Sequence, residues 1–113
     1  MKISKSTAYD IWHEQFGDAE WALDFSGRLM YIEDYGNEDA FTLCHGKRHP
    51  TGWDLHHILP KAQNGQDTRK NLLCTAIETN RKIGNRTTFN INGTRYQVKR
   101  NHGTPGYHIE KLS

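Results

Sequence analysis

The stretch WDLHHILPKAQNGQDTRKNLL, residues 53–73, contains the features that decide the fold of this chain. Its first part, residues 53–59, is apolar and branched, which predicts a β-strand. Pro60 ends that strand, because proline has no N–H to donate to a sheet. Residues 61–70 are polar and include an Asn-Gly turn signal. Residues 71–74 are then predicted to form a short second strand, which gives a strand–loop–strand unit.

A helix is predicted directly after this unit, over residues 76–83. Thr75 and Glu78 show the T-x-x-E spacing of a capping box. Gly84 is well placed to end the helix. The sequence therefore predicts a strand–loop–strand–helix order through the middle of the chain.

Upstream, residues 6–16 carry apolar side chains at helical spacing. Thr7 and Asp10 resemble a capping box, and Gly17 suits the position just past the helix end. Residues 21–33 are predicted to form a β-hairpin around a Ser-Gly turn.

The remaining segments are predicted as follows. Residues 34–52 are expected to be a loop with one short strand near residues 41–43, since the segment is rich in Gly and polar groups. The C-terminal part is predicted to be a meander, with strands over residues 87–91, 94–100 and 107–112. An Asn-Gly pair marks the first turn of this meander.

These elements define an α+β fold, and 113 residues are the usual size of one domain. We therefore expect a single domain over residues 1–113, with the decisive unit at about residues 53–86. No apolar run is long enough to span a membrane, and the N-terminus has no apolar signal segment. A cytoplasmic protein with two reduced thiols, Cys44 and Cys74, is the expectation.

Charge is distributed unevenly, although the net charge is only +2. Residues 1–45 carry three Lys or Arg against nine Asp or Glu, and residues 46–113 carry twelve against four. Such asymmetry favours a side that faces a polyanion. The alternative is that the two halves neutralise each other across the fold.

His56 and His57 are the candidate chemical groups. Successive side chains of a strand diverge, but a bend at Pro60 and a helix behind the strand can bring both histidines to one cleft with Asn80. One imidazole and the amide oxygen can hold a divalent cation, while the other imidazole accepts a proton from water. Basic residues that would bind a phosphodiester chain flank this set: Lys61, Arg69, Lys70, Arg81, Lys82 and Arg86. The alternative is that both histidines are structural.

The order HHILP, then Asn71-Leu-Leu, then NRKIGN resembles the motif of HNH endonucleases. That family shows Asp, Glu or His before His-Ile-x-Pro, a Gly-containing loop, Asn-Leu, and a final His or Asn on a helix. The separations of 14 residues from His57 to Asn71 and nine from Asn71 to Asn80 are similar to those of the family. Upstream, DFSGR and GWDLHHILP also resemble a subfamily of small HNH proteins, so the likeness covers roughly residues 22–86.

The resemblance implies a ββα-metal core and assigns roles by position. His57 corresponds to the general base, and His56 and Asn80 to the metal ligands. Asn71 corresponds to the middle Asn, which orients His57 or fixes the loop. The implied reaction is hydrolysis of DNA phosphodiesters, with 5′-phosphate and 3′-hydroxyl products. The implied cofactor is one divalent cation, and Mg²⁺ is the usual cation of the family.

Two departures qualify the resemblance. The family's zinc-binding C-x-x-C pair would fall on Ala76 and Thr79, so no structural zinc is expected. His rather than Asp at position 56 removes negative charge from the cation site, which favours Mn²⁺, Ni²⁺ or Zn²⁺ more than a carboxylate would.

Two other functions fit the sequence. The chain could be an inactive HNH-like module that binds nucleic acid or protein, as some phage anti-defence proteins do, or a toxin nuclease with an immunity partner. Nucleic acid, above all DNA, is the expected partner, and a protein could supply targeting or inhibition. The sequence leaves the oligomeric state open.

Overall fold

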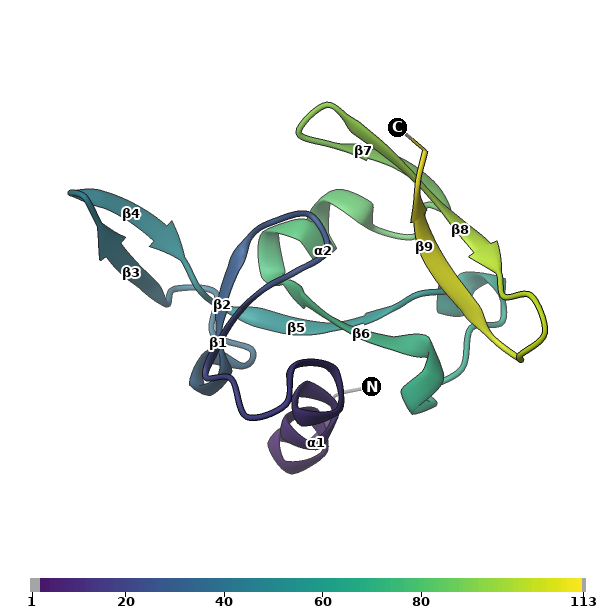
Figure 1. The fold of residues 1–113 in the computed structure, drawn as a ribbon, viewed down its shortest axis with the longest axis horizontal. Helices are drawn as coiled ribbons and strands as arrows, with labels where there is room; N and C mark the ends of the chain where they lie inside the picture. Colours follow the sequence, from purple (N-terminus) through teal and green to yellow (C-terminus); the bar gives the residue numbers. More distant parts are fainter. Residues whose placement is uncertain (1–2, 113) are drawn as a thin grey trace.

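The computed structural model describes residues 3–112, which form two α-helices and four small antiparallel sheets (Figure 1). This mixed architecture is compatible with the predicted α+β class. In chain order the elements are α1 (Lys5–Phe16), β1 (Trp21–Leu23), β2 (Leu29–Tyr31), β3 (Phe41–Cys44), β4 (Lys47–Pro50), β5 (Trp53–His57), β6 (Leu72–Ala76), α2 (Ile77–Ile83), β7 (Thr88–Ile91), β8 (Thr94–Arg100) and β9 (Tyr107–Lys111). Neither helix in residues 3–112 is long and apolar enough to cross a membrane.

The N-terminal helix α1 is capped by Ser4, not by the predicted Thr7–Asp10 box. The Ser4 hydroxyl accepts a hydrogen bond from the Thr7 backbone N–H at 3.3 Å. The prediction was wrong because Ser4 begins the helix one turn earlier, which places Thr7 within the first turn rather than before it. Gly17 ends the helix as predicted, with φ at 64°.

The central hairpin pairs β5 with β6 in antiparallel register, so that Trp53 faces Ala76 and His57 faces Leu72. Trp53 is fully buried and packs on the ring of Trp12 from α1, with ring centroids 4.9 Å apart. β5 ends at His57, two residues before the predicted end. The second strand was predicted over residues 71–74, but the structure places it at Leu72–Ala76.

The helix α2 starts and ends as the sequence predicts to within a residue, but its N-terminus is held differently. Ala76 precedes the helix and offers no side-chain cap, and the Thr75 hydroxyl is buried without a hydrogen-bond partner. The predicted Thr75–Glu78 box is wrong because Thr75 still belongs to the β6 ladder, where its side chain faces the interior. The Ala76 N–H is instead bound by the Asp24 carboxylate at 3.0 Å.

Residues 34–52 contain a complete hairpin, whereas the sequence predicts a loop with one strand. β3 and β4 pair with each other over four residue pairs and with no other strand in residues 3–112. His45 and Gly46 form the turn with φ values of 52° and 75°. Positive φ at both central residues is typical of the tight turns that match strand twist. In Figure 1 this β3–β4 hairpin stands out from the body of the molecule.

The hairpin β1–β2 and the C-terminal sheet β7–β8–β9 confirm two further predictions. Phe89, Ile91 and Tyr96 of the C-terminal sheet form a second core cluster with Ile83 of α2. The first cluster is built around Trp12 and Trp53. The helix α2 thus lies between the central hairpin and the C-terminal sheet (Figure 1).

Candidate active site

His56 and His57 leave β5 toward different surroundings but line the same cleft. His56 is buried, with 4% of its surface exposed, while His57 is half-buried. The cleft has a volume of about 200 Å³. It is lined by Leu55, His56, His57, Pro60, Lys61, Asn80, Gly84 and Asn85. The two imidazoles and the Asn80 amide are therefore brought together.

His56 and Asn80 make direct contact, with 2.7 Å between Nδ1 and Oδ1. Burial lowers the pKa of His56, and the neighbouring His57 charge acts in the same direction, although the hydrogen bond with Asn80 opposes both. The imidazole of His56 is therefore neutral over a wider pH range than an exposed histidine. Its Nε2 atom is buried and has no hydrogen-bond partner.

This pair has the donor chemistry that a divalent cation needs. Neutral imidazole nitrogen and amide oxygen both bind cations, and neighbouring ligands of an octahedral ion at about 2.1 Å lie about 3 Å apart. The observed 2.7 Å between Nδ1 and Oδ1 is close to that spacing. The residues present thus fit a cation held by two protein ligands and water.

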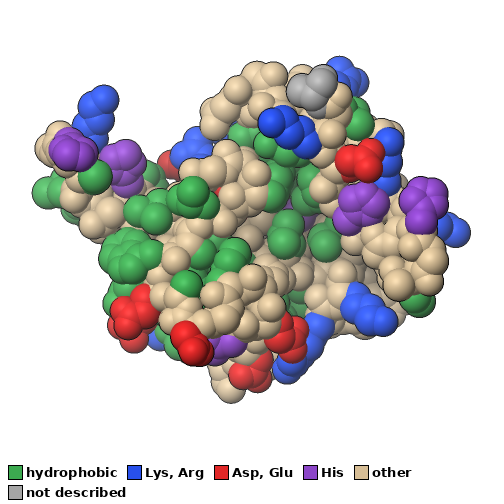
Figure 2. Space-filling view, in the orientation of Figure 1, with side chains coloured by type: hydrophobic (Ala, Val, Ile, Leu, Met, Phe, Trp, Pro, Cys, Tyr) green, Lys and Arg blue, Asp and Glu red, His purple; other side chains and the backbone are tan. Residues whose placement is uncertain are grey.

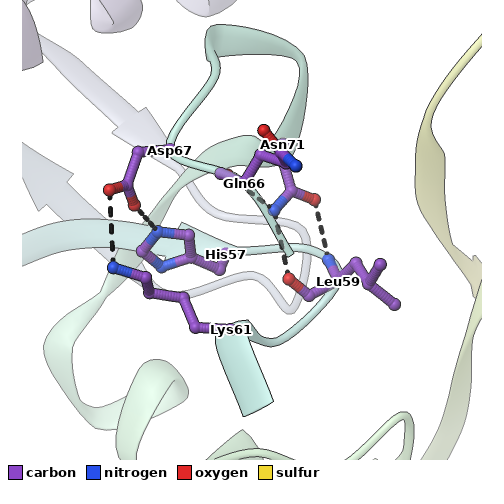
Figure 3. Close-up of polar contacts among 6 residues, drawn as sticks. All are labelled: His57, Leu59, Lys61, Gln66, Asp67 and Asn71. Atoms are coloured by element: carbon purple, nitrogen blue, oxygen red, sulfur yellow. Dashed lines mark hydrogen bonds and ion pairs between the residues drawn. The ribbon is translucent and has the colours of Figure 1, made fainter. Parts of the chain in front are cut away.

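His57 is held by Asp67, which was not among the predicted site residues. His57 Nε2 lies 2.5 Å from Asp67 Oδ1, and Lys61 Nζ lies 3.4 Å from Asp67 Oδ2 (Figure 3). The hydrogen bond from His57 lowers the pKa of Asp67, and Lys61 reinforces this against the opposing effect of burial. An ionised Asp67 accepts the Nε2 proton of His57 and leaves Nδ1 as the basic nitrogen.

A sequence signal for Asp67 did exist. It is the one acidic residue between Asp54 and Glu78, in the loop that must return to pair with β5. Only the path of that loop, however, brings the carboxylate to His57.

Asn71 fixes the same loop through three hydrogen bonds to the backbone. Its Oδ1 accepts from the Leu59 N–H at 2.8 Å, and its Nδ2 donates to the carbonyls of Leu59 at 3.1 Å and Gln66 at 2.9 Å (Figure 3). Because Gln66 precedes Asp67, Asn71 holds the backbone that carries the carboxylate. Of the two roles considered for Asn71, these contacts correspond to the fixing of the loop.

The six basic residues predicted to flank the site occupy different environments. Lys61 lies in the cleft, and Lys82 is exposed on α2. Arg86 donates to the backbone carbonyls of Lys82 and Ile83 at the end of α2. Lys70 lines a separate hollow beside Tyr107.

Arg69 and Arg81 are paired with carboxylates from the acidic half of the chain. Arg69 contacts Asp10 and Glu14 of α1, and Arg81 contacts Glu38. Part of the charge asymmetry is therefore neutralised across the fold, and these two arginines lie in ion pairs rather than free beside the cleft.

The cleft continues as a groove along α2. A second hollow, of about 440 Å³, shares Asn80, Gly84 and Asn85 with the cleft and is also lined by Asp54. A third, smaller hollow shares Glu38, Ile77 and Arg81 with the second and reaches Pro50 at the end of β4. We call this chain of three hollows the α2 groove; it runs from His57 to the foot of the β3–β4 hairpin.

Within residues 3–112, no group of three or more His, Cys, Asp or Glu side chains is placed to hold a metal ion. The His56–Asn80 pair is a different kind of set, with one imidazole and one amide. In comparisons with protein-family models, curated proteins and solved structures, nothing matches this chain. A functional assignment therefore depends on the motif and on the geometry of the cleft.

Proposed function

We propose that this chain is a metal-dependent endonuclease of the HNH type that hydrolyses DNA phosphodiester bonds. The observation that carries the proposal is the meeting of His56, His57 and Asn80 in one cleft, with His57 oriented by Asp67. In this proposal β5, β6 and α2 constitute a ββα-metal core.

His57 acts as the general base. Its Nε2–H is committed to Asp67, so Nδ1 takes the proton from the attacking water. The resulting imidazolium is stabilised by the carboxylate 2.5 Å away. Attack of the water oxygen on phosphorus then breaks the bond to the 3′ oxygen. Lys61, which lines the same cleft, is positioned to contact the phosphate charge.

His56 and Asn80 would hold the divalent cation, Mg²⁺ in the cell or Mn²⁺, Ni²⁺ or Zn²⁺ in its place. When bound, such a cation supplies Lewis-acid stabilisation of the phosphate and leaving-oxygen charge. Burial keeps His56 neutral, which an imidazole ligand requires. The proposed place of action is the cytoplasm, where Cys44 and Cys74 would stay reduced.

The experiment is nicking of supercoiled plasmid by the parent chain and by His57→Ala, with Mg²⁺ or Mn²⁺ and with EDTA. The parent should nick DNA only with metal, and His57→Ala should lose about 10³-fold or more of the rate while it still binds DNA. The control is His102→Ala, which removes an exposed imidazole outside the cleft.

Equal rates for the parent and His57→Ala would show that the assigned base is wrong. Absence of metal-dependent cutting on every nucleic acid tested would instead favour a binding module that uses the same cleft without hydrolysis.

A further inference from the structure

The two strands of the β3–β4 hairpin are almost entirely exposed. Seven of the eight strand residues are exposed, and only Thr42 is partly covered. Phe41 and Leu43 expose 46% and 67% of their surfaces. A two-stranded hairpin without a packed face is marginally stable in water. Large exposed apolar side chains on such an element indicate a binding surface.

The pairing register divides the hairpin into two faces. Phe41 lies opposite Pro50 and Leu43 opposite Arg48 on one face. The Arg48 guanidinium lies over the Phe41 ring, 3.8 Å from its centroid. Lys47 pairs with Cys44 on the other face, next to the turn.

The charge on the hairpin has one sign. Residues 41–50 contain Lys47, Arg48, His45 and His49 and no Asp or Glu. Figure 2 shows basic and histidine side chains gathered on the arm that projects at the upper left. In contrast to Arg69 and Arg81, this charge is not neutralised from within the hairpin, so it is complementary to phosphate.

The hairpin is also connected to the candidate active site. Pro50, the last residue of β4, lines the α2 groove, which continues past Asn80 to His57. The cleft and the foot of the hairpin therefore lie at the two ends of the α2 groove, on one side of the molecule's central unit.

We propose that the β3–β4 hairpin is an arm that inserts into the major groove of double-stranded DNA beside the bond that is cut. The inference rests on the proposed nuclease function and names its substrate as a B-form duplex. A two-stranded β-ribbon fits a major groove about 12 Å wide and about 8.5 Å deep. Strands of four residues reach about 13 Å, which is enough to enter that depth.

In this arrangement the side chains have separate tasks. Lys47 and Arg48 contact phosphates at the groove edges, and Phe41 and Leu43 provide apolar contact with base edges such as thymine methyl groups. Duplex RNA has a deep and narrow major groove that excludes such a ribbon, and single strands have no groove. Selective loss of duplex DNA binding is therefore the signature of this arm.

The test measures binding of fluorescein-labelled duplex DNA, duplex RNA and single-stranded DNA in EDTA, on a His57→Ala background that prevents cutting. Lys47→Ala/Arg48→Ala should weaken duplex DNA binding about tenfold at 0.1 M salt and lower the salt slope by about 2. Phe41→Ser/Leu43→Ser should weaken duplex DNA binding while leaving single-stranded DNA binding unchanged. Arg95→Ala/Lys111→Ala removes one Arg and one Lys from exposed positions of the C-terminal sheet and should change duplex binding less.

Each outcome decides between the two proposals. If the parent cuts DNA but the hairpin variants bind duplex DNA as tightly as the background chain, the proposed role of the hairpin is wrong and the proposed nuclease function is retained. That result would leave a protein partner for the hairpin. If duplex binding depends on the hairpin but the parent never cuts, the hairpin does bind duplex DNA and the proposed nuclease function is wrong. Equal loss on all three nucleic acids, or no duplex binding by the background chain, also overturns the arm.

Discussion

Asp67 determines which nitrogen of His57 carries a proton. Its carboxylate lies 2.5 Å from Nε2, and the nearby Lys61 ammonium helps to keep it ionised. Without that negative charge the imidazole would sample both tautomers, and only the one protonated at Nε2 leaves Nδ1 available as a base. Asp67 is therefore a positioning residue that acts through His57.

We expect Asp67→Asn to lower kcat for plasmid cutting about 10–100-fold and to leave KM nearly unchanged. The amide keeps the size of the side chain but removes its charge. The matched control is Asp18→Asn, which neutralises an exposed carboxylate in the turn after α1. A proportional rise in KM with constant kcat would mean that Asp67 helps to bind DNA rather than to orient the base.

Cys74 gives a residue-scale prediction about stability. Burial in β6 raises the pKa of this thiol to about 12 from 9.0. Between these values the unfolded chain releases the thiol proton and the folded chain retains it, so the free energy of unfolding falls as pH rises. Deprotonation of Cys74 in the unfolded chain should lower the free energy of unfolding by up to about 1.4 kcal/mol per pH unit in this range.

The measurement is urea denaturation between pH 8 and pH 10.5 for the parent, Cys74→Ala and Cys44→Ala. Cys74→Ala should show a flatter decline, and Cys44→Ala, which changes an exposed thiol, should follow the parent. Parallel curves for all three chains would contradict the assigned burial.

At the scale of elements, the loop between β5 and β6 positions Asp67 beside His57 in the candidate active site. Gly65 lies where the loop folds back on Leu59 and Pro60, and its N–H donates to the Pro60 carbonyl at 2.9 Å. A Cβ at this position would lie 1.7 Å from the Leu59 carbonyl oxygen. No side chain can be added here unless the loop backbone moves.

Gly65→Ala should therefore destabilise the fold by about 2–4 kcal/mol and displace Asp67 two residues away. Gly103→Ala is the control, because its Cβ would meet no atom within 4 Å and only its φ of 78° opposes the change. The control should lose about 1–2 kcal/mol. Urea denaturation compares the two variants, and equal losses would refute the tight loop.

The sequence predicts elements better than it predicts the contacts at their ends. The strands and helix over residues 53–83 were evident because Pro60, Gly84 and apolar branched runs act locally. Both predicted capping boxes were wrong. The spacing of side chains in a capping box does not show at which residue the backbone turns from extended to helical. Ser4 rather than Thr7 caps α1. At α2 the hydrogen bond is accepted by the Asp24 carboxylate, from the N–H of Ala76 just before the helix, and not by the Thr75 side chain.

In the candidate site, too, the residues on regular elements could be predicted and the residue in a loop could not. His56, His57 and Asn80 could be selected from their motif, since each lies on an element with strong local signals. Asp67 lies in an irregular loop whose path depends on Gly65 and on the hydrogen bonds of Asn71. The β3–β4 hairpin was missed because His-Gly is a weak turn signal and the paired strands lack an alternating buried face.

At the scale of the whole molecule, α2 connects the two core clusters. Its Ile83 is fully buried against Phe89 and Ile91 of the C-terminal sheet, while the start of the helix is tied to Gly52 and Asp24. Both ends of the helix are therefore fixed, and Asn80 is presented to His56 by the fold as a whole. A cation that bridges these residues would join elements 24 residues apart in the chain.

A cation that binds only the folded chain stabilises it, and ten times its Kd adds about 1.4 kcal/mol. For a chain of this size we expect Mn²⁺ to raise Tm by about 5 °C at that concentration and EDTA to reverse the rise. The double variant His56→Ala/Asn80→Ala should lose the Mn²⁺ response. The control His102→Ala/Asn90→Ala removes one exposed imidazole and one exposed amide and should retain it. Differential scanning calorimetry provides the readout independently of DNA cutting. A Tm rise that persists in the double variant would show that the cation binds elsewhere, because that chain lacks both side chains proposed to hold it.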